Sequence, residues 1–193
     1  MEKAVNIKNE ALKNGLIWGV VNIVLFLVTW YVAPSLMSSY WYAGISLLIG
    51  LAFATFFCID MRKKVGGYWT FGEALWPIFV TFVLAMGLVF VFNILFGKYI
   101  DTTYPEQMKE MVMAKSEATM KSFGLSDEET AKAMAKTSEN LEQQFTPSFS
   151  QAVMAFGISA IMYFIGAVIF ALIFKRNNPN PFANQANDQF GVN

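Results

Sequence analysis

The stretch MRKKVGGYWTFGEALWP, residues 61–77, joins two long apolar runs that contain no charged residue. It combines a basic cluster, Arg62, Lys63 and Lys64, with a double glycine and an aromatic segment. Basic residues beside an apolar run hold that end of a transmembrane helix in the cytoplasm, and adjacent glycines let a chain reverse its direction. The stretch therefore predicts a cytoplasmic turn between two membrane-spanning helices.

Four apolar runs without a charged residue determine the fold class: 15–33, 40–59, 74–97 and 152–174. Each has close to the ~20 residues that an α-helix needs to cross ~30 Å of hydrocarbon. They are apolar on every side, whereas helices of a soluble bundle carry a polar stripe. Only 15% of the residues are charged, against ~25% in an average soluble domain. We therefore predict an all-α integral membrane protein with four transmembrane helices.

Basic residues near the predicted spans indicate the orientation. They are Lys3, Lys8 and Lys13 before the first run, residues 62–64 after the second, and Lys175 and Arg176 after the fourth. With four spans all of these lie on one side, and the positive-inside rule makes that side cytoplasmic. We therefore expect a cytoplasmic segment at 1–14, a basic loop at 60–73 and a disordered cytoplasmic tail at 175–193. The first run is too long for a cleavable signal peptide, so we expect it to remain as a span.

Residues 98–151 lie outside the cytoplasm in this topology and carry helix-start signals. Thr103 with Glu106 and Ser126 with Glu129 have the spacing of a capping box, in which a hydroxyl and a carboxylate satisfy free backbone N–H groups. Gly124 can end the first helix in a left-handed conformation. We therefore predict an extracytoplasmic helical hairpin. Its second arm is expected to pack along Ala131, Met134, Ser138, Leu141 and Phe145.

Methionines on this hairpin make a candidate interaction surface. They are Met108, Met111, Met113, Met120 and Met134, joined by Leu141 of the second arm. Met-rich helical faces adapt to partners of different shape. The alternative is that the same side chains only seal the hairpin against itself and the membrane.

The sequence offers no recognised catalytic or metal-binding constellation. It has no histidine and a single cysteine, Cys58, which excludes an intrachain disulfide and a multi-cysteine zinc site. No charge lies inside a predicted span, where charges mark transport paths. Asp60 and Glu73 flank the inner loop, but ion pairs with the neighbouring basic residues, or simple solvation, explain them better than catalysis. We predict no enzyme activity, no cofactor and no nucleic-acid partner for this chain of zero net charge.

Polar and small residues within the spans are expected to serve helix packing. Asn22 and Asn93 lie too far apart in depth to pair, so each should bond a neighbouring backbone or hydroxyl group, with substrate contact as the alternative. Gly15 and Gly19 have the GxxxG spacing that lets helices approach closely. The spacing recurs at Ser46, Gly50 and Ala54, and at Ala155 and Ser159. Such faces pack within one bundle or, alternatively, form a homo-oligomer interface.

The inner loop contains the remaining candidate residues. These are Gly66, Gly67, Thr70, Phe71, Gly72 and Glu73. The double glycine allows the turn, the Thr–Glu pair is a third capping box, and the basic cluster before them should contact anionic lipid headgroups. A glycine in a first helical turn costs up to ~1 kcal/mol relative to Ala, so we expect a neighbouring helix or lipid to approach Gly72 closely. A phosphate-binding loop at this helix start is the alternative.

Residues 62–76, RKKVGGYWTFGEALW, resemble the hallmark of a bacterial membrane family known as domain-of-unknown-function 4199. The similarity extends over nearly the whole chain. It comprises Gly66, Gly67, Thr70, Phe71, Gly72, Glu73 and Ala74, then residues 124–129, then FKRNNPNPF at 174–182. The resemblance implies a small four-span protein of the bacterial inner membrane. It implies no activity and no site residues, because the family has no established function.

These observations favour a non-enzymatic, membrane-anchored interaction or scaffold protein that uses its outer hairpin. The expected partners are the lipid bilayer and a membrane or periplasmic protein, with a homo-oligomer as a further candidate. A small oligomeric transporter or channel is the alternative. An enzyme acting at the inner face through Asp60 and Glu73 is the least favoured reading.

Overall fold

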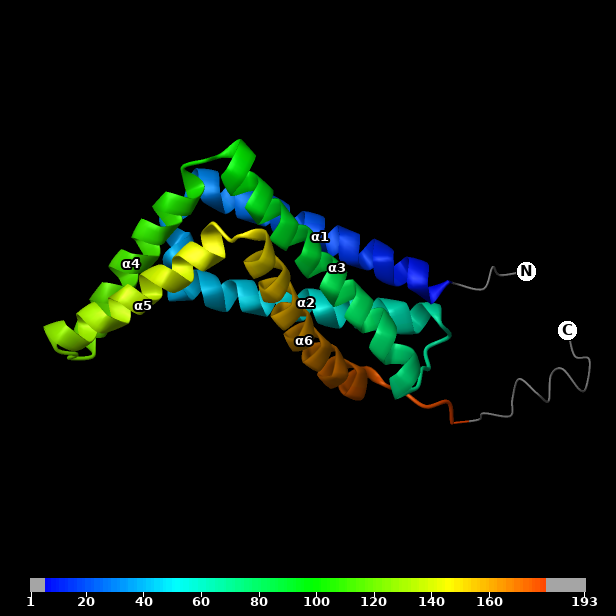
Figure 1. The fold of residues 1–193 in the computed structure, drawn as a ribbon. Helices are drawn as coiled ribbons and strands as arrows, with labels where there is room; N and C mark the ends of the chain where they lie inside the picture. The colour runs from blue at the N-terminus through cyan, green and yellow to red at the C-terminus, as the bar shows by residue number, and fades with distance from the viewer. Residues whose placement is uncertain (1–5, 180–193) are drawn as a thin grey trace, which may run out of the picture.

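The computed structural model describes residues 6–179, and the regular structure of this part of the chain is helical. The elements are α1 (Ile7–Val32), a 3-10 turn η1 (Pro34–Ser38), α2 (Tyr40–Lys64), α3 (Phe71–Leu95), a π-helical turn η2 (Phe96–Ile100), α4 (Tyr104–Ser122), α5 (Asp127–Phe145) and α6 (Phe149–Phe174). Figure 1 shows their arrangement. The predicted all-α class is confirmed. Of the predicted disordered tail, only residues 175–179 belong to the described part.

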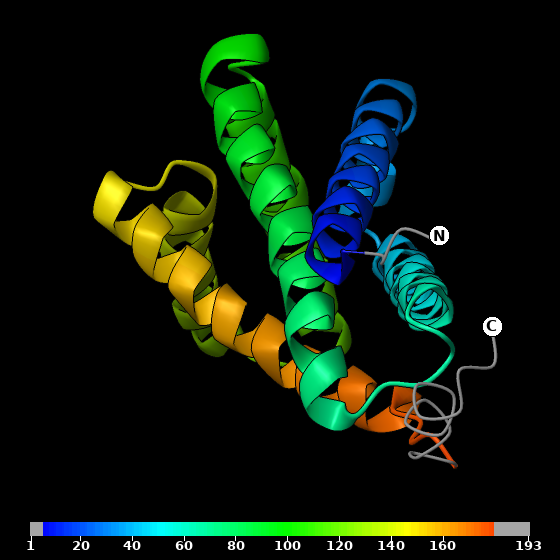
Figure 2. The same ribbon diagram turned by 90° about the vertical axis from the view of Figure 1, so that its right-hand side faces the viewer.

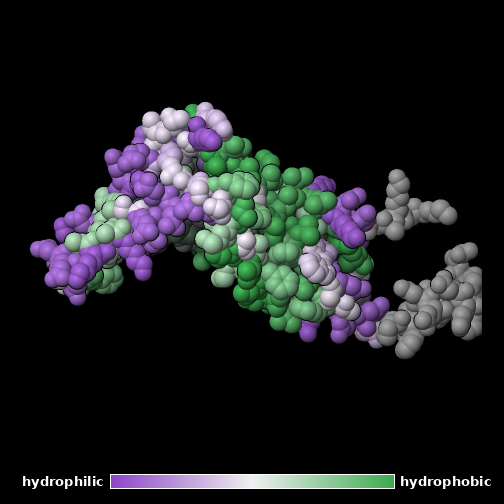
Figure 3. Space-filling model, viewed as in Figure 1, coloured by the Kyte–Doolittle hydropathy of each residue, from purple (hydrophilic) through white to green (hydrophobic). Residues whose placement is uncertain are grey.

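Four helices within residues 6–179 are long and apolar enough to cross a membrane: α1, α2, α3 continued by η2, and α6. They indicate a membrane protein, and their apolar side chains form the green band of Figure 3. Helices α1 and α3 begin before the apolar runs because their capping residues precede those runs. Asn6 accepts a hydrogen bond from the backbone N–H of Lys8 at the start of α1. Helix α2 ends after its run because it continues through the basic cluster.

Helix α3 is the centre of the bundle, with α1 along one side and α6 against another (Figures 1 and 2). The predicted GxxxG face brings α1 and α3 together. A Cβ added at Gly15 would lie 2.9 Å from both the Leu84 Cβ and the Thr81 carbonyl oxygen, and one at Gly19 would lie 2.7 Å from the Leu88 Cδ1. This face therefore packs within one chain.

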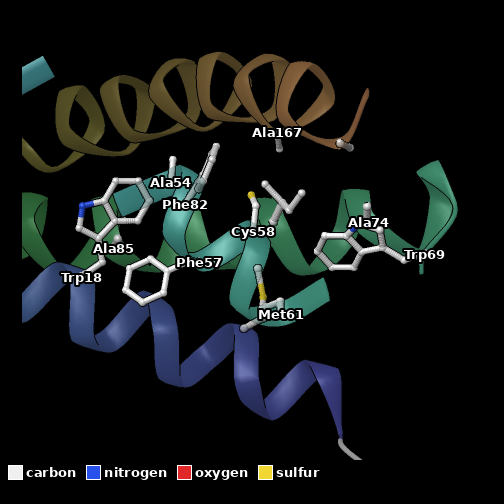
Figure 4. Close-up of a cluster of buried hydrophobic side chains, with 13 residues drawn as sticks. Trp18, Ala54, Phe57, Cys58, Met61, Trp69, Ala74, Phe82, Ala85 and Ala167 are labelled. Carbon is white, nitrogen blue, oxygen red and sulfur yellow. The ribbon is translucent and has the colours of Figure 1, made fainter. Parts of the chain in front are cut away.

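A cluster of buried side chains joins the inner halves of these helices (Figure 4). Its largest members include Trp18, Phe57, Met61, Trp69, Ile78 and Phe82, and it includes the fully buried Cys58. Alanines of α3 and α6 complete it, which lets the two helices approach closely. Thr81 donates its hydroxyl hydrogen to the Pro77 carbonyl at 2.9 Å, so this buried hydroxyl is satisfied within its own helix.

A second cluster fixes the base of the hairpin to the opposite end of the bundle. It consists of Phe26, Trp30, Phe96, Tyr104 and Met108. The Trp30 and Tyr104 rings meet edge to face with centroids 4.9 Å apart, a favourable aromatic geometry. The Trp30 indole N–H also donates to the Asp101 carboxylate at 2.9 Å. Helix α4 is thus tied to α1 and α3.

Helices α4 and α5 form a hairpin that extends beyond the bundle (Figure 1). Gly124 turns the chain with φ of +76°. The predicted capping box of Ser126 and Glu129 is confirmed. The box of Thr103 and Glu106 is wrong: the Thr103 hydroxyl donates to the Asp101 carboxylate at 2.6 Å and makes no cap.

The predicted packing seam of α5 is wrong at one position. Ala131 is exposed, whereas Thr130 and Leu141 are buried. The inward face therefore starts one residue earlier than the 3-4 spacing suggested. A capping box at the start of α6, formed by Ser148 and Gln151, was missed. Its signal is present in the sequence SFSQ at 148–151.

Candidate functional site

The inner loop between α2 and α3 folds as its residue types require. Gly66 and Gly67 have φ values of +93° and +84°, a left-handed conformation that other residues rarely adopt. The backbone N–H of Thr70 donates to the Glu73 carboxylate at 2.7 Å, and the N–H of Glu73 donates back to the Thr70 hydroxyl. Both the predicted turn and the predicted third capping box are therefore confirmed.

The loop also holds the end of α6. Trp69 and Arg176 exchange two backbone hydrogen bonds, of 3.0 and 2.9 Å. The Trp69 indole N–H donates to the Phe174 carbonyl at 2.9 Å, and the Arg62 guanidinium donates to the same oxygen at 3.3 Å. The last carbonyls of a helix have no partner within it, so these donors satisfy one of them. We call the set of Arg62, Trp69, Phe174 and Arg176 the inner clasp.

A charged triad connects α1 and α2 beside the inner clasp. The Lys64 ammonium lies 2.7 Å from the Glu10 carboxylate and 2.7 Å from that of Asp60. The predicted ion pair of Asp60 with the basic cluster is confirmed. Asp60 and Glu73 have separate partners. Of the three basic residues expected at lipid headgroups, Arg62 and Lys64 are engaged within the chain and Lys63 is exposed.

The expectation of a close helix neighbour at Gly72 is wrong. A Cβ there would have no heavy atom within 4 Å among the described residues, and the glycine is exposed. Phe71 beside it is half-buried against the inner cluster. Packing within the chain therefore gives no reason for a glycine at this position.

The hairpin methionines face inward more than outward. Met108 is buried in the cluster at the hairpin base, and Met111 packs against that cluster. Met113, Met120 and Met134 are half-buried, and Leu141 is buried. No methionine of this set is among the exposed hydrophobic side chains, whereas Phe123 at the tip is 78% exposed.

An open groove of about 740 Å³ lies between α2 and α6, over α1 and α3. We call it the lateral groove. Its lining is mainly apolar, with five polar side chains: Asn22, Ser46, Asn93, Ser159 and Tyr163. Small residues of α2 and α6 border it, and a Cβ at Gly50 would have no neighbour within 4 Å among the described residues. On α2 and α6, small residues therefore border an open groove. The favoured interpretation was that they pack closely against another helix.

The two asparagines of the groove differ in their hydrogen bonds. Asn22 donates its side-chain N–H to the Trp18 carbonyl at 2.9 Å, which confirms the expected backbone bond. The Asn93 side-chain oxygen is buried and has no hydrogen-bond partner among the described residues. The expectation of a backbone or hydroxyl partner is therefore wrong for Asn93. Within residues 6–179 no group of three His, Cys, Asp or Glu side chains is arranged to hold a metal ion.

Comparison with known proteins identifies the chain at the level of a family. A family model described as "Protein of unknown function (DUF4199)" matches residues 13–176. The match begins at residue 13 within α1, covers the other three apolar helices, the inner loop and the hairpin, and ends at the clasp residue Arg176. No curated protein matches the chain, and no solved structure matches it.

Proposed function

The chain belongs to the DUF4199 family, whose function is unknown, and from this premise we propose that it is a non-enzymatic, membrane-anchored interaction protein. The α4–α5 hairpin is the interaction element in this proposal. The protein crosses the bacterial inner membrane four times, with both termini in the cytoplasm and the hairpin on the periplasmic side. The positive-inside rule supports this orientation, because Lys63, Lys175 and Arg176 are exposed at the end of the bundle opposite the hairpin.

One observation carries the proposal: the hairpin is an arm that is fixed at its base and carries exposed apolar side chains at its tip. A hydrogen bond of 3.1 Å between the Thr119 and Tyr40 hydroxyls also holds its first arm against the start of α2. Its base belongs to the cluster around Trp30 and Tyr104. Its first arm, α4, has 19 residues, which gives a reach of ~28 Å at 1.5 Å per residue. Figure 3 shows a hydrophilic surface over the hairpin, with lighter patches toward its end. Phe123 and Leu125 at the tip are 78% and 38% exposed, and exposed apolar side chains on a polar arm suit contact with a protein partner.

Photo-crosslinking in cells tests the proposal. A benzophenone amino acid at Phe123 should give adducts with another protein, because this side chain projects from the tip. The same amino acid at Phe149, which is 87% exposed at the start of α6, is the matched control and should give fewer. Probes at Met113 and Met134 should react mainly within the chain. Only intramolecular products from Phe123, at several expression levels, would exclude the tip as a docking site.

A small oligomeric transporter or channel is the second candidate, supported by the lateral groove and its unpaired Asn93. No charged side chain lines this groove, and intramembrane charges are the usual mark of an ion or proton path. Flux measurements in proteoliposomes, with Asn22→Ala and Asn93→Ala variants, test it. A flux that both variants reduce would favour this function over the interaction proposal.

A further inference from the structure

The lateral groove is long enough to hold one extended alkyl chain. Its lining on α3 runs from Phe82 to Asn93, which corresponds to ~17 Å along the helix. Helices α2 and α6 meet at the inner clasp, where Arg62 reaches Phe174. They separate toward the other end of α6 (Figure 2). The groove is therefore open to the side, where lipid surrounds a membrane helix.

Asn22 bonds the Trp18 carbonyl, but other polar groups of the groove lack partners. The Asn93 side-chain oxygen has no hydrogen bond, and the hydroxyls of Ser46 and Ser159 make none with other described residues. A polar group without a partner in an apolar medium costs free energy that a ligand can recover by bonding it. The terminal torsion of an asparagine side chain is broad and roughly two-fold. A rotation of the Asn93 amide therefore presents either its oxygen or its nitrogen to the groove.

These requirements select the chemistry of a ligand. It must be neutral, because no charged residue lines the groove and an unpaired charge in hydrocarbon is expensive. It must be apolar along most of its length. A hydroxyl both donates and accepts, so it can bond Asn93 in either amide orientation. Asn93 precedes Lys98 by five residues, which places it ~8 Å deeper than that charge. An amphiphile without a phosphate group can place its hydroxyl at this depth.

We propose that the lateral groove binds one long-chain neutral amphiphile, whose hydroxyl pairs with the Asn93 amide and whose chain lies along α3 toward Phe82. Phospholipids fit this chemistry less well, because their charged headgroups would find no charged partner in the groove. The lateral groove and the hairpin tip are different surfaces. The ligand-binding proposal can therefore be tested independently of the interaction proposal.

Photolabelling of the purified full-length protein in phosphatidylcholine nanodiscs tests the site. The probes are a diazirine-bearing octadecanol and the corresponding octadecane, which has the same chain but neither a hydrogen-bond donor nor an acceptor. The alcohol should label peptides that contain Met86 or Met162, both in the groove lining. The alkane should label them about fivefold less, the factor expected for one net hydrogen bond. The variant Asn93→Leu should reduce labelling by the alcohol to the level of the alkane.

Blocking the groove provides a second, independent variant. Gly50 lines the groove and Gly44 on the same helix does not, and a Cβ at either would have no neighbour within 4 Å. Gly50→Phe should abolish labelling by the alcohol, whereas Gly44→Phe should leave it unchanged. Equal labelling by alcohol and alkane, or labelling that persists in Gly50→Phe, would overturn the proposal. A third outcome would also overturn it: a Ser46→Cys variant forms an interchain disulfide in nanodiscs, and this disulfide prevents labelling. A second copy of the chain would then occupy the groove.

Discussion

Gly15 and Gly50 lie at four-residue spacings of small residues, yet their surroundings are opposite. Gly15 touches α3, whereas a side chain at Gly50 would enter the lateral groove. The spacing predicted a close approach correctly at Gly15, because a helical period identifies which residues share a face. It does not identify what lies opposite that face. The same reason explains Asn93: its residue type predicted a hydrogen bond, but the partner depends on where α6 lies.

The contrast between these glycines gives the first prediction. Gly15→Ala should destabilise the protein by ~1–3 kcal/mol, the usual cost of overpacking, because the new Cβ would lie 2.9 Å from the Thr81 carbonyl oxygen. Gly50→Ala is the matched control and should be neutral or slightly stabilising. Thermal unfolding of both variants in detergent measures the difference. Equal unfolding temperatures would contradict the α1–α3 contact.

Asp101 gives a prediction for pH dependence. Hydrogen bonds from the Thr103 hydroxyl, and next from the Trp30 indole, hold the pKa of Asp101 below its ordinary value of 3.8. The fold stabilises the ionised form, so this contribution is complete above the unfolded-state pKa. It is lost as the pH falls below 3.8 through the lower folded-state pKa. Hydrogen exchange at the start of α4 should therefore increase only in strong acid.

The control for this pH effect is Asp101→Asn, whose amide stays neutral at every pH but can still accept a hydrogen bond. Its exchange at the start of α4 should not change across the same acidic range. A variant that responds to acid as strongly as the parent would show that another carboxylate controls the hairpin base.

At the scale of the elements, the inner clasp explains why two tryptophans with similar positions in the sequence differ in burial. Trp69 and Trp76 both lie near the cytoplasmic end of a predicted span, where aromatic residues are common. Trp69 is 3% exposed and bonded to the end of α6, whereas Trp76 is 61% exposed. The local sequence pattern predicts an aromatic residue at the membrane interface. Whether its side chain turns inward depends on the Phe174 carbonyl, which lies 105 residues later in the chain.

Trp69→Ala should destabilise the protein by ~3–5 kcal/mol, as expected for removing a buried aromatic side chain. It should also speed hydrogen exchange of the Arg176 N–H, which bonds the Trp69 carbonyl. Trp76→Ala is the matched control, and its effect on unfolding should be much smaller. If the two alanine variants unfold at the same temperature, the clasp does not hold α6.

For the molecule as a whole, the sequence predicted the helices better than their arrangement. Four uncharged apolar runs were sufficient for the membrane class, because length and composition alone determine whether a helix can cross a bilayer. The central place of α3 and the separation of α2 from α6 depend on side-chain shapes across helices that are distant in sequence. For this reason the sequence did not predict the lateral groove, although two of its polar residues, Asn22 and Asn93, were expected to make hydrogen bonds.

The proposed orientation of the whole molecule predicts a labelling pattern. Ser122→Cys at the hairpin tip and Lys63→Cys in the inner loop both place a thiol at an exposed position. The native Cys58 is fully buried and should stay unlabelled. A membrane-impermeant maleimide added to spheroplasts should react with the Ser122→Cys variant and reach the Lys63→Cys variant only after lysis. The reverse labelling pattern would show the opposite topology, with the hairpin in the cytoplasm.

The inner clasp also bears on how the protein is made. Phe174 follows Trp69 by 105 residues, and a ribosome adds ~5–20 residues per second, so the loop waits on the order of 5–20 s for its partner. During that interval the Trp69 indole and backbone lack the partners that residues 174–176 supply. The pairing of Trp69 with Arg176 can form only after α6 has been made. Among the contacts of residues 6–179, the inner clasp is therefore one of the last that synthesis makes possible.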